Sequence, residues 1–189
     1  MTKILLLLYC LAGVAPATIF SQKTFISIGA DLASPSSVAF KRNAGTGFGG
    51  SVRIASSWGK HILGMATFTY LSFAKSVPYS RIPTSTTKAS AYTIQAGIKY
   101  YIISKKDIPR GFFFALETGI MPTATRFTYA TNPDNNFKET GLSGAPGFGY
   151  QFGNLEPGIY LQYNLTNAGY NIYYFDFRLA YTFFRRKKE

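Results

Sequence analysis

Hydrophobic and polar residues alternate along most of this chain with a period of two. In residues 91–102, for example, Ile94 and Ile98 fall on one face, while Gln95 and Lys99 fall on the other. Successive side chains of a β-strand point to opposite faces, whereas a helix would scatter these residues around its circumference. The pattern therefore predicts β-strands.

Eight segments of the chain show this alternation. They are residues 24–32, 46–58, 61–74, 91–102, 111–121, 141–152, 155–164 and 172–184. Their lengths suit strands that cross a bilayer at a tilt, and bacterial outer-membrane barrels have an even number of strands. Two prolines, Pro146 and Pro157, each remove a hydrogen-bond donor from the predicted ladders.

Segment 61–74 has the least regular pattern. Leu63 and Met65 share a face with Thr67 and Thr69. A β-bulge would exchange the faces within the segment. The sequence does not locate such a bulge, so the register of this strand stays open.

The connections between the eight segments alternate between long and short. The long ones, rich in Ser, Thr, Asn and Pro, are residues 33–45, 75–90, 122–138 and 165–171; the short ones are 59–60, 103–110 and 153–154. Outer-membrane barrels have long extracellular loops and short periplasmic turns. The sequence therefore predicts an all-β fold, an eight-stranded antiparallel transmembrane up-and-down β-barrel formed by residues 23–184.

The composition of the two strand faces predicts which face is the lumen. A soluble barrel such as a lipocalin would turn the apolar face inward, which would crowd Phe, Tyr, Leu and Ile into a narrow interior. With the apolar face outward, the small and charged residues line the lumen. The charged residues expected there are Asp31, Arg53, Lys99, Glu117, Glu156, Asp176 and Arg178.

These four acidic and three basic residues nearly cancel in charge, as an enclosed polar interior requires. We expect them to form an ion-pair network that plugs the barrel. Neighbouring strands bring Lys99 towards Glu117, and closure of the sheet brings Arg178 towards Asp31 and Glu156. Aromatic residues near the predicted strand ends are expected to anchor the barrel at the membrane interface. They are Trp58, Tyr100, Tyr101, Tyr150, Tyr163, Tyr170, Tyr173, Tyr174 and Tyr181.

Residues 1–22 have the features of a secretory signal peptide. An early positive charge is followed by an apolar run that ends at Val14, and then by small residues. The run is shorter than the roughly 20 residues that a spanning helix needs. We expect cleavage after Ala17 or near Ser21 and Gln22, and export to the bacterial outer membrane.

Net charge and cysteine content agree with export. The chain carries a net charge of +12, which in an intracellular protein would suggest nucleic acid as a partner. Here the basic residues are dispersed over the connections and over a C-terminal tail, residues 185–189, so we expect no nucleic-acid partner. The only cysteine, Cys10, lies within the predicted signal. The mature chain would then have neither a disulfide nor a thiol nucleophile.

Candidate chemistry is sparse, and we predict no catalytic, cofactor-binding or metal-binding residue. The only histidine, His61, lies beside a predicted short turn, so a lipid A-modifying enzyme would lack its general base. Gly45, Gly47 and Gly50 have GxGxxG spacing, but a loop precedes them and a strand follows, which does not form a phosphate cradle. No His, Cys or carboxylate cluster has metal-ligand spacing.

Three segments carry a family resemblance. Residues 94–101 (IQAGIKYY), 111–119 (GFFFALETG) and 177–183 (FRLAYTF) resemble the small outer-membrane β-barrel domain proteins of the OmpA/OmpX-like superfamily, in the version common in Bacteroidetes. The resemblance implies a fold and a location, and most such proteins have no assigned activity. It also implies insertion by the barrel assembly machinery, which would have to tolerate the basic tail after the terminal aromatic residue.

The leading functional hypothesis is a non-enzymatic structural, adhesive or envelope-interaction role through the extracellular loops. Outer-membrane lipids and lipopolysaccharide are the expected partners, because basic loop residues can bind phosphate groups. The residues concerned are Lys41, Arg42, Lys75, Arg81, Lys88, Arg126 and Lys138. A narrow solute channel and a lipid A-modifying enzyme are the alternatives; an interior of eight strands is only wide enough for its own side chains.

Overall fold

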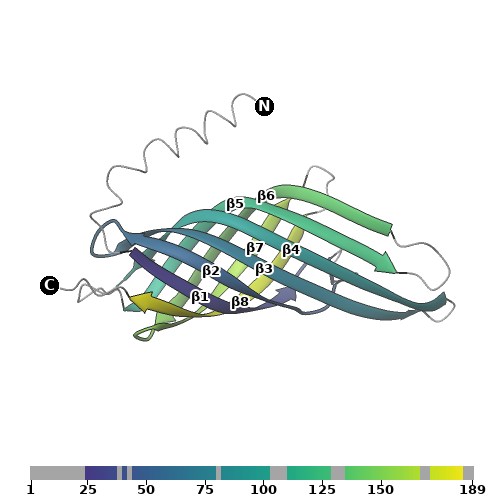
Figure 1. The fold of residues 1–189 in the computed structure, drawn as a ribbon, viewed down its shortest axis with the longest axis horizontal. Helices are drawn as coiled ribbons and strands as arrows, with labels where there is room; N and C mark the ends of the chain where they lie inside the picture. The colour runs from purple at the N-terminus through teal and green to yellow at the C-terminus, as the bar shows by residue number, and fades with distance from the viewer. Residues whose placement is uncertain are drawn as a thin grey trace, which may run out of the picture.

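The computed structural model shows a closed barrel of eight antiparallel strands (Figure 1). It describes residues 24–37, 40–41, 44–79, 82–102, 110–128, 135–166 and 171–184. The predicted signal, the C-terminal tail and most of the predicted turn at 103–110 lie outside these residues.

The strands follow one another around the barrel in chain order, and β1 pairs with β8 to close it. They are β1 Thr24–Pro35, β2 Gly47–Ser57, β3 Ile62–Tyr79, β4 Ile82–Tyr101, β5 Gly111–Thr128, β6 Asn135–Gln151, β7 Leu155–Leu165 and β8 Ile172–Phe184. The predicted eight-stranded, all-antiparallel up-and-down barrel is confirmed. Among the described residues, no helix has the length and apolar character needed to span a membrane.

The apolar face of the strands points outward. Ile54, Phe114 and Leu179 are each more than half exposed, and the charged residues of the opposite face are buried. A water-soluble barrel would not leave such a continuous apolar wall uncovered. The wall is what lipid requires of a membrane-spanning barrel, in which all backbone groups are paired around the ring.

Two predicted loops are largely strand. β3 continues to Tyr79 and β4 begins at Ile82, so most of the predicted loop 75–90 is a hairpin; β5 and β6 likewise occupy much of 122–138. The prediction of loops was wrong here because these segments have lost the alternation of apolar and polar residues. A strand that leaves the bilayer has water on its outer face and no longer needs an apolar one, whereas Thr still favours extended backbone.

These extensions make the barrel asymmetric. The strands β3 to β6 have 18, 20, 18 and 17 residues, whereas β1, β2, β7 and β8 have 12, 11, 11 and 13. The β2–β3 ladder ends at the Gly47–Phe73 pair and the β6–β7 ladder at the Leu142–Leu165 pair. Beyond these pairs, the four long strands continue as a sheet past the rest of the barrel (Figure 1). We call this sheet the projection.

Strand β3 contains no bulge in the segment for which one was considered. Its ladder with β2 is continuous from Leu63 to Phe73, and its ladder with β4 is continuous from Ile62 to Val77, with a register shift only after Val77. Leu63 and Met65 are buried in the lumen together with Thr67 and Thr69. This face of the segment combines apolar and polar residues because the lumen does so as well, with apolar side chains near its ends.

The prolines interrupt one ladder without changing its register. Pairing between β6 and β7 is absent between the Gly144–Tyr163 and Gly147–Tyr160 pairs, next to Pro146. From the Gly144–Tyr163 pair to the Gly147–Tyr160 pair, each strand advances by the same number of residues. The register is therefore the same on both sides of the gap. The missing donor therefore weakens the ladder locally and leaves the barrel intact.

Candidate functional site

The lumen is the most elaborate polar site of the described residues. The structure places all seven charged residues expected there in the lumen, and none is more than 4% exposed. They come from β1, β2, β4, β5, β7 and β8, each at an inward position of its strand. The alternation of side chains along a strand is sufficient to bring them together, because every second residue faces the axis of the barrel.

Arg178 of β8 lies at the centre of one half of the network. In the β1–β8 register it stands directly opposite Asp31, and its Nε donates to Asp31 Oδ1 at 2.8 Å. Its Nη2 donates to Asp176 Oδ2 at 3.0 Å, and its Nη1 lies 3.5 Å from Glu117 Oε1. One guanidinium thus contacts three carboxylates. The five fixed donors of arginine suit this role, which a lysine could not fill with the same geometry.

Glu156 of β7 is the centre of the other half. Its Oε1 accepts hydrogen bonds from Arg53 Nη1 and from Lys99 Nζ, both at 2.6 Å. Arg53 Nη2 also lies 3.5 Å from Glu117 Oε1, the atom that Arg178 contacts. Glu117 therefore joins the two halves into one network.

Two expected pairings are not found. Lys99 binds Glu156 and not Glu117, because Lys99 stands opposite Ala115 in the β4–β5 register and its side chain reaches across the lumen. Arg178 reaches Glu117 across the lumen, whereas Oε1 of Glu156 binds Arg53 and Lys99. In a barrel this narrow, side chains meet across the axis as readily as along the wall.

Neutral residues that we did not predict for this site complete the polar layer. Tyr160 accepts a hydrogen bond from Arg53 at 3.1 Å and places its ring 4.5 Å from the guanidinium carbon of Arg178. Gln95 donates to Ser143 at 3.2 Å and to Gln162 at 3.1 Å. All of them occupy inward positions, so the alternation that identified the charged residues could have identified these as well.

The network has unequal numbers of acids and bases. Asp31 Oδ2, Glu117 Oε2 and Asp176 Oδ1 are buried without a hydrogen-bond partner among the described residues. All three carboxylates surround Arg178. A buried acceptor without a donor is unfavourable. Asp31 and Asp176 therefore depend on Arg178 as their cation, and Glu117 shares Arg178 with Arg53.

Apolar layers close the lumen on both sides of the charges. Near the turn end of the barrel the layer includes Phe25, Leu63, Met65, Tyr101 and Phe113. The layer near the projection includes Leu71, Phe73, Met121 and Tyr174, with Phe40 packed against it. The cavities that we find beside these layers have volumes of only about 10 Å³ each, about the minimum for one water molecule.

These layers correct part of the predicted aromatic girdle. Trp58, Tyr100 and Tyr181 are exposed on the outer wall as expected. Tyr101 and Tyr174, however, are fully buried in the lumen. They directly follow other tyrosines, and consecutive residues of a strand point to opposite faces, so one member of each pair must point inward. Tyr170 lies outside the described residues.

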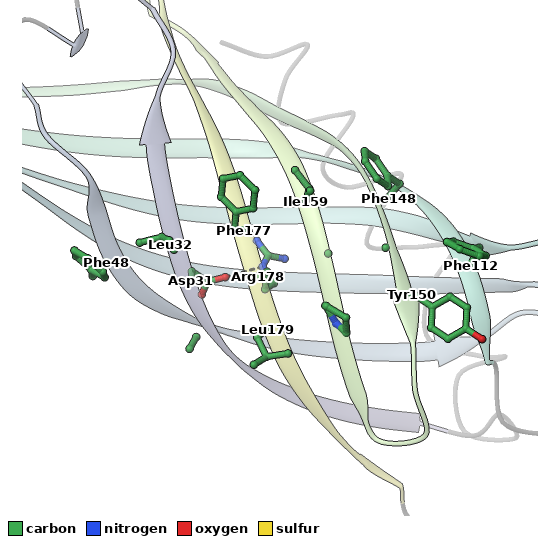
Figure 2. Close-up of a pocket in the computed structure, with 14 residues that line it drawn as sticks. Asp31, Leu32, Phe48, Phe112, Phe148, Tyr150, Ile159, Phe177, Arg178 and Leu179 are labelled. Atoms are coloured by element: carbon green, nitrogen blue, oxygen red, sulfur yellow. Dashed lines mark hydrogen bonds and ion pairs between the residues drawn. The ribbon is translucent and has the colours of Figure 1, made fainter.

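A hollow of about 750 Å³ lies on the outer wall of the barrel and is lined mainly by apolar side chains (Figure 2). Phe48, Phe148 and Phe177 are among the outward-facing residues around it. Asp31 and Arg178 touch the hollow from within the wall, but their charged ends bind one another in the lumen. The hollow therefore presents an apolar surface to lipid and offers no charged group to a polar ligand.

The other candidate motifs have structural roles. His61 Nδ1 lies 2.9 Å from the carbonyl oxygen of Tyr101, beside the ring of Tyr100. A Cβ atom on Gly47 would collide with the ring of Phe73, so this glycine makes room for the apolar layer near the projection. Within the described residues, no group of three or more His, Cys, Asp or Glu side chains is placed to hold a metal ion.

Comparisons with known proteins concern the fold alone. No protein-family model matches the chain, and no curated protein matches it. Solved structures do match. Ail, the attachment invasion locus protein of Yersinia pestis, has a TM-score of 0.61 at 13% identity over 86% of this chain and 99% of its own.

Two further barrels match over similar lengths. Neisserial surface protein A has a TM-score of 0.53 at 15% identity, covering 86% of this chain and 97% of its own. OprG of Pseudomonas aeruginosa has a TM-score of 0.53 at 11% identity, with the same coverage of both chains. The chain therefore has the fold of the small eight-stranded outer-membrane β-barrels of the OmpA/OmpX-like kind.

Proposed function

We propose that this protein is a non-enzymatic envelope protein of a bacterial outer membrane, and that it acts as an adhesin or interaction protein through the projection. The observation that carries this proposal is the filled lumen. Seven buried charges lie between two apolar layers, and the cavities beside these layers are of about 10 Å³. The interior thus supports stability, which leaves the outer end of the barrel as the part available for contact.

The direction of the barrel supports the same proposal. The start of β1 and the end of β8 lie at the end of the barrel opposite the projection (Figure 1). Outer-membrane barrels keep short turns and both termini on the periplasmic side and extend their long hairpins outward. The projection would then stand above the outer leaflet, where a partner can reach it.

An anionic partner is the one that the charges favour. Lys88, Arg126 and Lys138 are exposed on the described outer parts of β4, β5 and β6. Ail, which has the same fold, has been crystallised with the heparin analogue sucrose octasulfate. Similarity of fold does not transfer that ligand, but it makes a sulfated polysaccharide a reasonable probe for this chain.

The experiment shortens the tips of the projection and retains the barrel. Residues 77–85 and 128–134 are each replaced by an Asn-Gly turn, which joins the in-register pairs Ser76–Thr86 and Phe127–Asn135. Cells producing the full chain should attach to a heparin-coated surface. Cells producing the shortened chain, which loses Arg81 and the surface of the tips but keeps Lys88, Arg126 and Lys138, should attach more weakly. Heat-modifiable gel migration checks that both barrels are folded. Equal attachment by the two would refute the adhesive role of the tips.

The alternatives receive less support. A solute channel would need a continuous polar path, whereas apolar layers lie on both sides of the charges. A lipid A-modifying enzyme would need a base beside a nucleophile, whereas His61 Nδ1 faces a backbone carbonyl. Unchanged lipid A mass spectra on expression would agree with the non-enzymatic proposal, and an altered acylation pattern would overturn it.

A further inference from the structure

Basic residues gather at the turn end of the barrel, around the ends of neighbouring strands. Residues 185–188, with the sequence RRKK, directly follow Phe184, the last residue of β8. Lys23 directly precedes β1, and Lys60 is exposed in the short connection between β2 and β3. The four strands concerned, β8, β1, β2 and β3, are consecutive in the closed sheet. We call these six basic residues the basic rim.

The strand register places the ends of β8, β1 and β2 at one level of the barrel. Phe184 stands opposite Phe25 in the β1–β8 ladder, and Phe25 stands opposite Ala55 in the β1–β2 ladder. Neighbouring strands lie about 4.8 Å apart, so Phe184 and Ala55 are separated by about 10 Å around the wall. Arg185 continues directly from Phe184, and the connection that carries Lys60 begins after β2 ends, two residues beyond Ala55. The basic rim is therefore one local surface at this side of the barrel.

The lipid-facing wall ends directly at the basic rim. Phe183 and Trp58 are 50% and 61% exposed on the outer face. The Trp58 ring lies against the wall, because a Cβ atom on Gly64 of β3 would collide with it. Tryptophan is typical of the headgroup level of a bilayer. Arg185 and Lys60 each follow one of these aromatic residues by two positions, at most about 7 Å of extended chain, so their long side chains can reach lipid phosphates.

The exposed surface of this end carries no negative charge in the part of the chain that the structure describes. All described carboxylates except that of Glu139 are buried in the lumen, and Glu139 lies in the projection at the other end. Residues 185–189 contain one acidic residue, Glu189, against four basic ones. An anionic lipid surface attracts such a cluster, and each Lys or Arg near it strengthens the attraction about fivefold. The charge and the height of the basic rim therefore favour an anionic lipid surface as its partner.

We propose that the basic rim binds anionic phospholipids of the leaflet that surrounds the turn end, and that it concentrates them beside β8, β1 and β2. Phosphatidylglycerol has the required chemistry, because its phosphate keeps a net negative charge, whereas the amine of a zwitterionic headgroup cancels this charge. The position favours a lipid over a soluble partner, because the basic rim directly continues the apolar wall. The inference rests on the proposed function in taking the barrel as embedded in a membrane with this leaflet periplasmic. It does not involve the projection.

The test uses Trp58, the only tryptophan of the chain, as a reporter of the lipids beside the basic rim. The folded chain is reconstituted into phosphatidylcholine vesicles that contain a small fraction of brominated phosphatidylglycerol or, separately, of brominated phosphatidylcholine. Bromine quenches the fluorescence of a tryptophan that it contacts, so the ratio of the two quenching strengths measures the local enrichment of anionic lipid. We expect an enrichment of at least about fivefold, the effect of one basic residue near an anionic surface. Added salt should reduce this enrichment.

The variant removes four of the six charges of the basic rim. It combines Arg185→Gln, Arg186→Gln, Lys187→Gln and Lys188→Gln, which lie outside the strands. A matched control removes four charges at the projection end, with Lys75→Gln, Arg81→Gln, Lys88→Gln and Lys138→Gln. The enrichment beside Trp58 should fall severalfold in the variant, towards equal quenching by the two lipids, and should stay unchanged in the control. Heat-modifiable gel migration checks that all three barrels are folded.

Three results would overturn the proposal. Equal quenching by the two lipids in the wild type would mean that anionic lipid is not enriched at the basic rim. Unchanged enrichment in the variant would mean that residues 185–188 do not bind it, and equal losses in the variant and the control would mean that total charge decides. Failure of the proposed adhesive function is recognised separately. The chain with shortened tips keeps the basic rim, so its enrichment should be unchanged whether or not its attachment to heparin is reduced.

Discussion

At the scale of single residues, Arg178 is the position on which most buried charge depends. Its guanidinium contacts Asp31, Glu117 and Asp176, and each of these carboxylates has a second oxygen without a partner among the described residues. Four acidic and three basic residues share the lumen. Loss of a cation therefore increases an existing imbalance, whereas loss of an acid relieves it.

This asymmetry predicts unequal effects of two substitutions. Arg178→Ala should lower the free energy of unfolding by about 3 to 5 kcal/mol, the usual range for removing one partner of a buried pair. Asp176→Asn should have a clearly smaller effect, because Arg178 keeps two carboxylates. Urea unfolding of the barrel in detergent measures both. Lys138→Ala on the exposed wall is the control and should not shift the unfolding midpoint. Equal shifts for Arg178→Ala and Asp176→Asn would show that the imbalance is unimportant.

Gly147 tests the packing around the network. A Cβ atom there would collide with Cδ1 of the Tyr160 ring, and this ring contacts both Arg53 and Arg178. Gly147→Val should therefore destabilise the barrel by about 1 to 3 kcal/mol, as overpacking of an interior does. Gly59→Ala is the matched control, since a Cβ there would meet nothing within 4 Å. The same urea titration compares the two, and a neutral Gly147→Val would mean that the tyrosine ring has room to move.

At the scale of strands, the sequence was sufficient to predict strands and their faces where one face contacts lipid and the other lines the lumen. The alternation in residues 91–102 and 172–184 predicted which side chains point inward, and the structure places them accordingly. It was insufficient for residues 75–90 and 122–138. Outside the bilayer neither face has to be apolar, so polar strand and polar loop have similar sequences.

The lumen, too, could be predicted only in part. Inward charged residues could be found from strand alternation alone, because the same rule assigns every strand. Their ion-pair partners could not be predicted in this way. Lys99 binds Glu156 on the opposite side of the lumen, and not its expected neighbour Glu117. Pairing across a barrel depends on strand stagger and side-chain reach, which a pattern along one strand does not contain. The apolar layers were not predicted, because we assigned apolar residues to the outer face. Leu63 and Met65 show that apolar residues also lie in the lumen.

The assignment of strand faces can be tested by placing a charge on the outer wall. Phe114 of β5 is 59% exposed and Leu179 of β8 is 53% exposed, and we expect both to contact lipid. Phe114→Arg or Leu179→Arg should destabilise the barrel by about 2 to 4 kcal/mol in a bilayer, the range for arginine near the midplane. Unfolding titrations in phospholipid vesicles measure this. Arginine at Trp58, in the interfacial region, should have a much smaller effect, and similar values at all three positions would mean that the faces are wrongly assigned.

At the scale of the whole molecule, the sealing of the lumen makes the barrel a support for its outer end. The charged layer lies between an apolar layer on the turn side and another on the projection side. A solute would have to pass both. The charges themselves bind one another, so ions entering the lumen would have to break these pairs as well.

We expect this barrel to conduct no ions through its lumen. Purified protein in a planar bilayer should show no stable single-channel steps, while an open porin in the same membrane shows them. Phe113→Ala and Phe73→Ala open one apolar layer each, and each variant should stay closed because the other layer and the charged network remain. Stable steps from the wild type would contradict the sealed lumen and favour the channel alternative. Steps from Phe73→Ala alone would show that the layer beside the projection is the barrier, and that the network below it admits ions.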